Sequence, residues 1–180
     1  MVQALNNMPM SGGVQVTPRF IFGANGQLNN CLHLIDDRFL IYVAGHNIVV
    51  YNLDDGSQQF IPGSENATQI NFVAKSMSGR YIAYCERAQP HAQVTVYEVL
   101  AKKKRKTLPE PDMENLSIEC REFLGCAFSP TTEQSHLITL SGEPDWQAIL
   151  WQWDQFKMLA KIDLNIVDPV ETSTFQISLN

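Results

Sequence analysis

The 180-residue sequence lacks a long apolar run, a signal peptide and a regular cysteine pattern, and each absence narrows what the chain can be. Its best apolar run, Phe39–Ala44, is far shorter than the roughly 20 residues that a membrane-spanning helix needs. The N-terminal segment has neither the basic start nor the apolar centre of a secretory signal. The four cysteines are irregularly spaced and three lie in apolar surroundings, so we expect buried, reduced thiols rather than a disulfide framework.

Basic residues are few, and they are unevenly distributed. Lys and Arg total 13 against 19 Asp and Glu, which gives a net charge of −6. Five of the basic residues form one run, Lys102–Lys106 (KKKRK), so the other 8 face all 19 acidic residues and the rest of the chain carries −11. An acidic body repels phosphate backbones, so we expect no binding to nucleic acid, and we expect no binding to membranes.

Motifs of catalysis and cofactor binding are also missing from the sequence. It contains no phosphate-binding loop, no dinucleotide-binding glycine pattern and no serine nucleophile elbow. The pair Cys120 and Cys126 is the nearest approach to the paired spacing of a zinc site. We therefore expect no metal, no cofactor and no catalytic residue. A cysteine nucleophile stays open, because a histidine could approach it in space. The histidines are scattered, at His33, His46, His91 and His136.

The apolar residues occur in short segments that are rich in Val, Ile, Phe and Tyr and end at turn signals such as Asp54-Asp55-Gly56. Such segments are typical of β-strands, and Asp-Gly between two of them indicates a hairpin. The expected strands are 30–35, 38–44, 46–53 and 58–61, then 68–74, 80–86, 92–99 and about 105–108, then 121–128, 136–140, 147–153 and 156–163.

These strands repeat in units of four. The third strands of the units align on the aromatic residues Tyr51, Tyr97 and Trp151, which are 46 and 54 residues apart. A four-stranded unit at this period is typical of a WD-repeat β-propeller, in which Trp151 would wedge between blades. A β-sandwich also offers many short strands, but its turns would not restart in register every fourth strand. We predict an all-β fold: a partial WD-repeat β-propeller with three four-stranded antiparallel blades and an open fourth.

The predicted domain organisation is a disordered tail at 1–17, followed by the N-terminal part of a propeller at 18–180. The blades cover about 28–64, 66–109 and 119–164, and 172–180 forms the first strand of the next blade. Arg19–Phe22 reads as a short strand without a partner in its own unit. Three blades leave an apolar face open at each end, so we expect the isolated chain to be unstable or oligomeric unless another polypeptide or further C-terminal sequence closes the ring.

Two short motifs are specific enough to suggest a family. They are FIPGS at 60–64 and LWQW at 150–153. Together they resemble the N-terminal region of the cilia- and flagella-associated protein 57 family, WD-repeat coiled-coil proteins of motile cilia, and the similarity covers about 18–180. The segments between them that share it are Gly79–Ala83, Val94–Glu98, Lys104–Leu108 and Ala127–Pro130.

The resemblance implies a non-catalytic scaffold in the cytoplasm, cytoskeleton and ciliary axoneme that helps to dock or regulate inner dynein arms on doublet microtubules. Its implied partners are inner dynein arm, radial spoke or other axonemal proteins, with tubulin as a further candidate. The chain lacks the family's heptads and stops inside the expected strand Thr174–Ser178, so it is a fragment, a truncated product or a short relative. The alternatives are a cytosolic or nuclear WD-repeat adaptor and, more remotely, a hydrolase-like propeller enzyme.

Candidate partner-binding residues lie in and after the basic run. We expect the run to form a loop between the third and fourth strands of the second unit. Its alternative roles are a solvated surface, a contact with an acidic partner such as tubulin, and a nuclear localisation signal. The Pro-rich acidic segment after it is expected to be a projecting docking loop. The candidate residues are Lys102, Lys103, Lys104, Arg105, Lys106, Glu110, Asp112 and Glu114.

Overall fold

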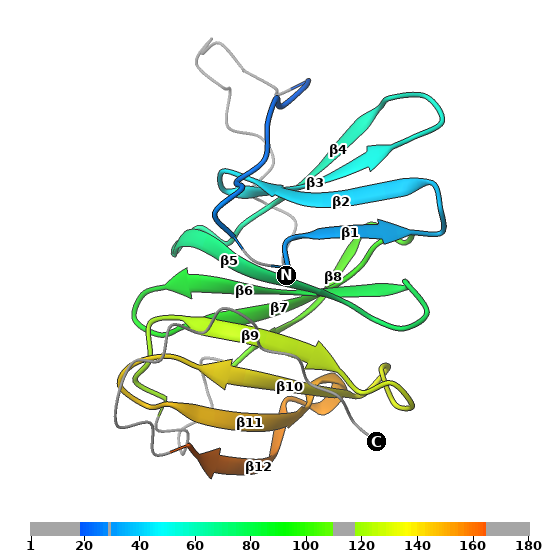
Figure 1. Ribbon diagram of the computed structural model, residues 1–180. Coiled ribbons are helices and arrows are strands. Elements are labelled where there is room, and N and C mark those ends of the chain that lie inside the picture. The colour runs from blue at the N-terminus through cyan, green and yellow to red at the C-terminus, as the bar shows by residue number, and fades with distance from the viewer. Residues whose placement is uncertain (1–18, 29, 110–117, 165–180) are drawn as a thin grey trace, which may run out of the picture.

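The computed structural model describes residues 19–28, 30–109 and 118–164, which form three antiparallel four-stranded sheets that follow one another along the chain (Figure 1). Each sheet is a simple meander, here called a blade. Blade 1 consists of β1 (Leu32–Ile35), β2 (Phe39–Ala44), β3 (Asn47–Asn52) and β4 (Gln58–Pro62). Blade 2 consists of β5 (Ala67–Lys75), β6 (Tyr81–Ala88), β7 (Gln93–Glu98) and β8 (Lys103–Leu108). Blade 3 consists of β9 (Phe123–Phe128), β10 (His136–Ser141), β11 (Gln147–Gln152) and β12 (Lys157–Asp163).

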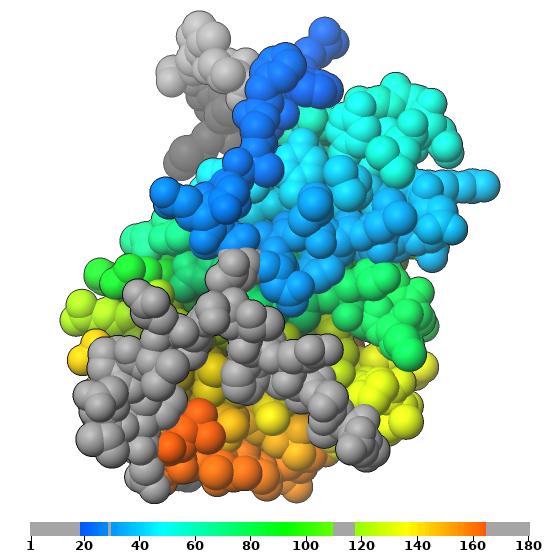
Figure 2. Space-filling view, viewed as in Figure 1, coloured from blue at the N-terminus to red at the C-terminus, as the bar shows by residue number. Residues whose placement is uncertain are grey.

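The predicted all-β fold with four-stranded antiparallel blades is confirmed. Within the described ranges, the one helical segment is the 3-10 turn η1 (Trp153–Gln155), and no helix there is long and apolar enough to cross a membrane. The blades are stacked in chain order, and the space-filling view places blade 1 and β12 at opposite ends of the molecule (Figure 2).

The strands form where apolar residues alternate with partly exposed ones, because successive side chains of a strand point to opposite faces of the sheet. In β2, Ile41 and Val43 are buried toward blade 2, whereas Leu40 and Tyr42, which alternate with them, are partly exposed. The hairpin turns have the expected chemistry, since Gly45 and Gly56 adopt φ values of +60° and +72°. Glycine adopts such a conformation without steric cost.

The core is divided between the two blade interfaces. One cluster joins blade 1, through side chains such as Ile35 and Ile48, to blade 2, through Ile82 and Tyr84. The second cluster joins blade 2 to blade 3 and contains Trp151, so the prediction that this residue wedges between blades is confirmed. Each blade interior is therefore completed by its neighbour, as repeat architectures require.

One expected strand is wrong. Arg19–Phe22 is not a strand, because its backbone meets a side chain instead of a strand edge. The Ile21 N–H donates to Gln58 Oε1 at 2.8 Å, and Gln58 Nε2 donates to the Ile21 carbonyl at 3.1 Å. The tail at 1–17 and the strand at 172–180 lie outside the described residues, and the domain limits stay predictions.

Candidate protein-interaction site

The basic run belongs to the β7–β8 hairpin of blade 2. Lys102 lies in the turn with φ +52°, and the rest of the run lies in β8, the outermost strand of its blade. The prediction that the run forms a loop is therefore wrong for Lys103 and Lys104, whereas Arg105 and Lys106 lie in the strand expected at about 105–108. The reason is cross-strand pairing, since Lys103 lies opposite Glu98, and Lys104 lies opposite Tyr97 on β7.

Glu98 neutralises one member of the run. Its carboxylate accepts a hydrogen bond from Arg80 Nε at 2.8 Å and forms an ion pair with the Arg105 guanidinium. The Glu98 side chain is only 8% exposed, whereas the side chains of Arg80 and Arg105 are 50% and 34% exposed, so the carboxylate is enclosed while its partners reach solvent. The hydrogen bonds from Arg80 and then from Arg105 hold the pKa of Glu98 below its ordinary value of 4.5. The charge of Arg105 is thus paired with a carboxylate of its own blade.

Lys106 is held by the neighbouring blade. Its Nζ lies 3.6 Å from the ring centroid of Phe156, which occupies the turn after η1 in blade 3 and has φ +55°. A cation over an aromatic face is attracted by the negative face of the ring. Lys106 therefore ties the outer edge of blade 2 to blade 3.

The remaining part of the run is Lys102, Lys103 and Lys104, here called the lysine triplet. All three side chains are exposed, and none forms an ion pair with another residue of the described part. The structure thus divides the predicted site into two residues that hold the strand in place and three that present their charge to solvent. The other candidates, Glu110, Asp112 and Glu114, lie outside the described residues.

Sequence reasoning missed the residues that hold the strand, namely Arg80, Glu98 and Phe156. A signal for Glu98 was available, because a short turn at 99–102 sets the register that brings an acidic and a basic residue face to face across the hairpin. Arg80 and Phe156 come from another hairpin and another blade, and no local pattern points to them.

Three of the four buried cysteines are poor nucleophiles. Burial raises the pKa of Cys31 to about 11 and that of Cys120 to about 12, and beside Cys120 the carboxylate of Asp145 acts in the same direction. Burial also raises the pKa of Cys85 well above 9.0. Because the thiolate is the reactive form, these three thiols are unreactive near neutral pH. Within the described ranges, no group of three or more His, Cys, Asp and Glu side chains could hold a metal ion.

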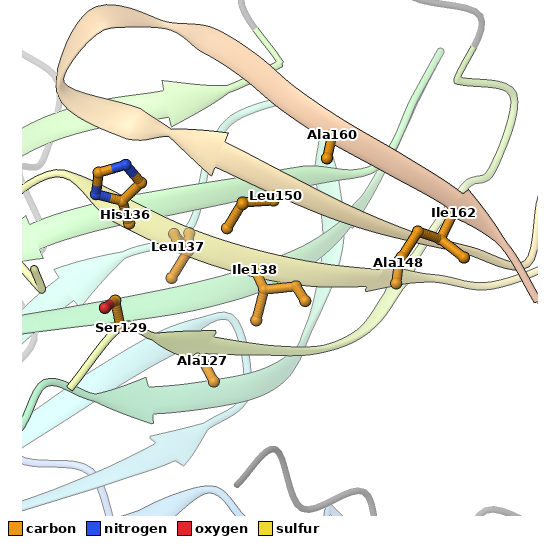
Figure 3. A pocket seen from close by; sticks show the side chains of 9 residues that line it. All are labelled: Ala127, Ser129, His136, Leu137, Ile138, Ala148, Leu150, Ala160 and Ile162. Atoms are coloured by element: carbon orange, nitrogen blue, oxygen red, sulfur yellow. The ribbon is translucent and has the colours of Figure 1, made fainter. Parts of the chain in front are cut away.

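A second surface lies on blade 3, where apolar side chains line a groove of about 210 Å³ (Figure 3). We call it the blade-3 groove. Ile138 and Leu150 belong to it, whereas their neighbours Ile149 and Trp151 belong to the core shared with blade 2. Since side chains alternate along a strand, the groove lies on the sheet face that points away from blade 2. Its lining residues are Ala127, Ser129, His136, Leu137, Ile138, Ala148, Leu150, Ala160 and Ile162.

Comparison with solved structures places the fold among β-propellers. The β-propeller domain of Myceliophteria thermophila Cps50 (Swd1) superposes with a TM-score of 0.57 at 13% sequence identity. The alignment covers 83% of this chain and 41% of that domain. The three blades thus correspond to somewhat less than half of a propeller.

Comparison with curated proteins gives a consistent result. Cilia- and flagella-associated protein 57 of Mus musculus is 30% identical over 162 residues, which is 89% of this chain. Cilia- and flagella-associated protein 57 C of Tetrahymena thermophila is 29% identical over 165 residues, which is 90% of this chain. The chain spans 12% of the length of each relative, and no family model matches it. Over about nine-tenths of its length, the chain is therefore related to the cilia- and flagella-associated protein 57 family.

Proposed function

We propose that this protein is a non-catalytic scaffold of motile cilia that helps to dock or regulate inner dynein arms on doublet microtubules. The observation that carries the proposal is the similarity of nearly the whole chain to two proteins named as cilia- and flagella-associated, one from a mammal and one from a ciliate. A propeller supports such a role because its strand edges and loops form a rigid surface on which other proteins can dock.

The lysine triplet is the contact element of this proposal. Lys102 lies in the hairpin turn, and Lys103 and Lys104 begin an outer strand that is held in place through the contact of Arg105 with Glu98 and of Lys106 with Phe156 from blade 3. Charges on a fixed strand lose less conformational entropy on binding than charges on a mobile loop. The partner surface is acidic, and inner dynein arm, radial spoke and other axonemal proteins, together with tubulin, are the candidates.

Fractionation of cilia tests the proposal. Cilia from cells that produce the protein are demembranated, and the axonemes are extracted at increasing salt before the protein is detected with an antibody. We expect the protein to remain with the axonemes at low salt and to be released as salt rises, because contacts through exposed charges are screened.

Recovery of the protein from the cytosol or nucleus, with none in the axonemes, would contradict the proposal and favour a cytosolic or nuclear adaptor. The protein could also be axonemal but stay in place when the inner dynein arms are missing, while its own loss leaves those arms in place. That result would support the ciliary location and contradict the docking role.

A further inference from the structure

The outer edge of β8 is an unused strand edge. One edge of β8 pairs with β7, and β8 is the last strand in the order of its sheet. In the part of the chain that the structure describes, no backbone hydrogen bond joins β8 to any segment other than β7. An edge of this kind presents a row of N–H and C=O groups that can accept an additional strand.

Several contacts already hold this edge in an extended conformation. Arg105 is paired with Glu98, and Lys106 lies against Phe156. Further along, the Thr107 hydroxyl lies 3.0 Å from that of Thr95, and Leu108 is fully buried. An edge that is ordered before binding avoids much of the entropic cost of strand addition.

The charge of β8 selects which strand can be added. Edge lysines normally discourage strand pairing, because an apolar strand would strip water from the ammonium groups and a basic strand would be repelled. An acidic strand instead supplies a counter-charge for the lysines on the sheet face where its carboxylates lie. The rest of the chain carries a net charge of −11, so on average it repels an acidic segment, and the basic run is the densest positive charge in the sequence.

We propose that the outer edge of β8 binds an acidic, extended peptide segment of a partner protein as an added strand, with the carboxylates of that segment facing the lysine triplet. The inference rests on the proposed docking role and gives it a chemical partner. Backbone hydrogen bonds supply part of the affinity, and the lysines supply specificity and salt dependence.

A binding assay with the full chain tests the charge selection. The probe is a fluorescein-labelled ten-residue peptide in which Glu and Val alternate, and binding is followed by fluorescence anisotropy at low salt. We expect Lys103→Glu together with Lys104→Glu to weaken binding by at least about tenfold.

The matched control is Lys157→Glu together with Lys161→Glu, the same charge change at two exposed residues of β12, the outer strand of blade 3. We expect this control to change affinity by less than about threefold. Equal losses in the two double variants would overturn the proposed site.

Backbone methylation of the probe tests strand addition. Two peptides are made with N-methyl groups on alternate residues, one on the Glu set and one on the Val set, so that each blocks one edge of the extended peptide while all charges remain. Strand addition uses one edge of the peptide, so we expect one methylated peptide to lose at least about tenfold in affinity and the other to bind almost normally. Equal binding of both methylated peptides and the parent would overturn strand addition.

Two further measurements complete the test. Circular dichroism identifies a variant that fails to fold, and Lys103→Gln with Lys104→Gln then replaces the charge reversal. If deletion of 110–114 creates peptide binding that the intact chain lacks, the acidic residues of the chain itself compete for the edge, and the proposal of a partner strand is wrong. If the protein fractionates with axonemes but does not bind the acidic peptide, this inference is wrong and the proposed function stands. If the protein binds the peptide but is absent from axonemes, only the proposed function is wrong.

Discussion

Trp151 shows how a single side chain connects the repeat to the packing of the blades. It is fully buried between blades 2 and 3, and its indole N–H donates to Thr139 Oγ1 at 2.8 Å. The aligned residues Tyr51 and Tyr97 are only partly buried, so the same repeat position is enclosed to different degrees in the three blades.

Removal of the indole N–H should destabilise the protein beyond the loss of ring volume. In Trp151→Phe the Thr139 hydroxyl remains buried without its donor, which costs about 1–3 kcal/mol. Thr139→Val removes the other partner, so we expect the double variant to be more stable than the sum of the single changes predicts, by about 1 kcal/mol. Urea unfolding of the four proteins provides this cycle. Additive losses would show that the hydrogen bond contributes nothing specific.

Glu98 should make the stability of the chain sensitive to acid. Its pKa is lowered in the folded state by Arg80 and Arg105. The stabilisation of the fold by the Glu98 carboxylate is therefore fully present above its ordinary pKa, and it is lost as the pH falls through the pKa of Glu98 in the folded protein. We expect Glu98→Gln to lower the urea midpoint more at pH 7 than at pH 3. The same reduction at both pH values would mean that the carboxylate charge is not what stabilises the hairpin.

At the scale of elements, the link from β4 to β5 sets how blade 1 sits on blade 2. The fully buried Glu86 of β6 accepts hydrogen bonds from the Ser64 N–H at 2.6 Å and from the Ser64 hydroxyl at 2.9 Å. Next to it, His46 Nε2 lies 3.1 Å from the Ser64 carbonyl. A Cβ on Gly63 would come within 2.6 Å of the same His46 nitrogen. The FIPGS motif thus ends in a turn whose residues make defined contacts with Glu86 and His46.

Gly63→Ala should loosen this turn. The new methyl group forces the His46 ring to move, and overpacking of this kind costs about 1–3 kcal/mol. The control is Gly26→Ala, where nothing lies within 4 Å of the added Cβ, and we expect it to change stability by less than about 0.5 kcal/mol. Thermal unfolding of both variants measures the difference. A Gly63→Ala protein as stable as the control would show that His46 moves without cost.

The strands could be predicted from the sequence because their signals are local. Alternation and turn signals, such as Asp55-Gly56 in blade 1, indicated the hairpins, and the aromatic spacing indicated the repeat. The start of β8 was placed about two residues late, since a run of lysines resembles a solvated loop until Glu98 is seen opposite Lys103. The contacts of Lys106 with Phe156 and of Glu86 with Ser64 join different blades or the link between them. No local pattern in the sequence predicts such contacts.

At the scale of the whole molecule, both terminal blades present apolar side chains on the faces that point away from blade 2. Leu32 and Leu34 of β1 are 63% and 43% exposed, and Ile162 in the blade-3 groove is 63% exposed. In a closed propeller each of these faces would meet a neighbouring blade. We therefore expect another polypeptide or further sequence to cover them, and the isolated chain should use them to associate with itself.

Self-association through the blade-3 groove can be tested with two substitutions on the same strand. Ile162→Lys places a charge in the groove, whereas Leu159→Lys makes the same change at a residue of β12 that is 40% exposed and lies outside the groove lining. Because burying an unpaired ammonium costs several kcal/mol, we expect Ile162→Lys to shift the sedimentation velocity profile of the 180-residue chain strongly toward monomer. Leu159→Lys should sediment like the original chain. If the original chain is already a monomer that melts cooperatively, the expectation of an open, self-associating blade face is wrong. If both variants dissociate equally, association depends on general surface charge and not on the groove.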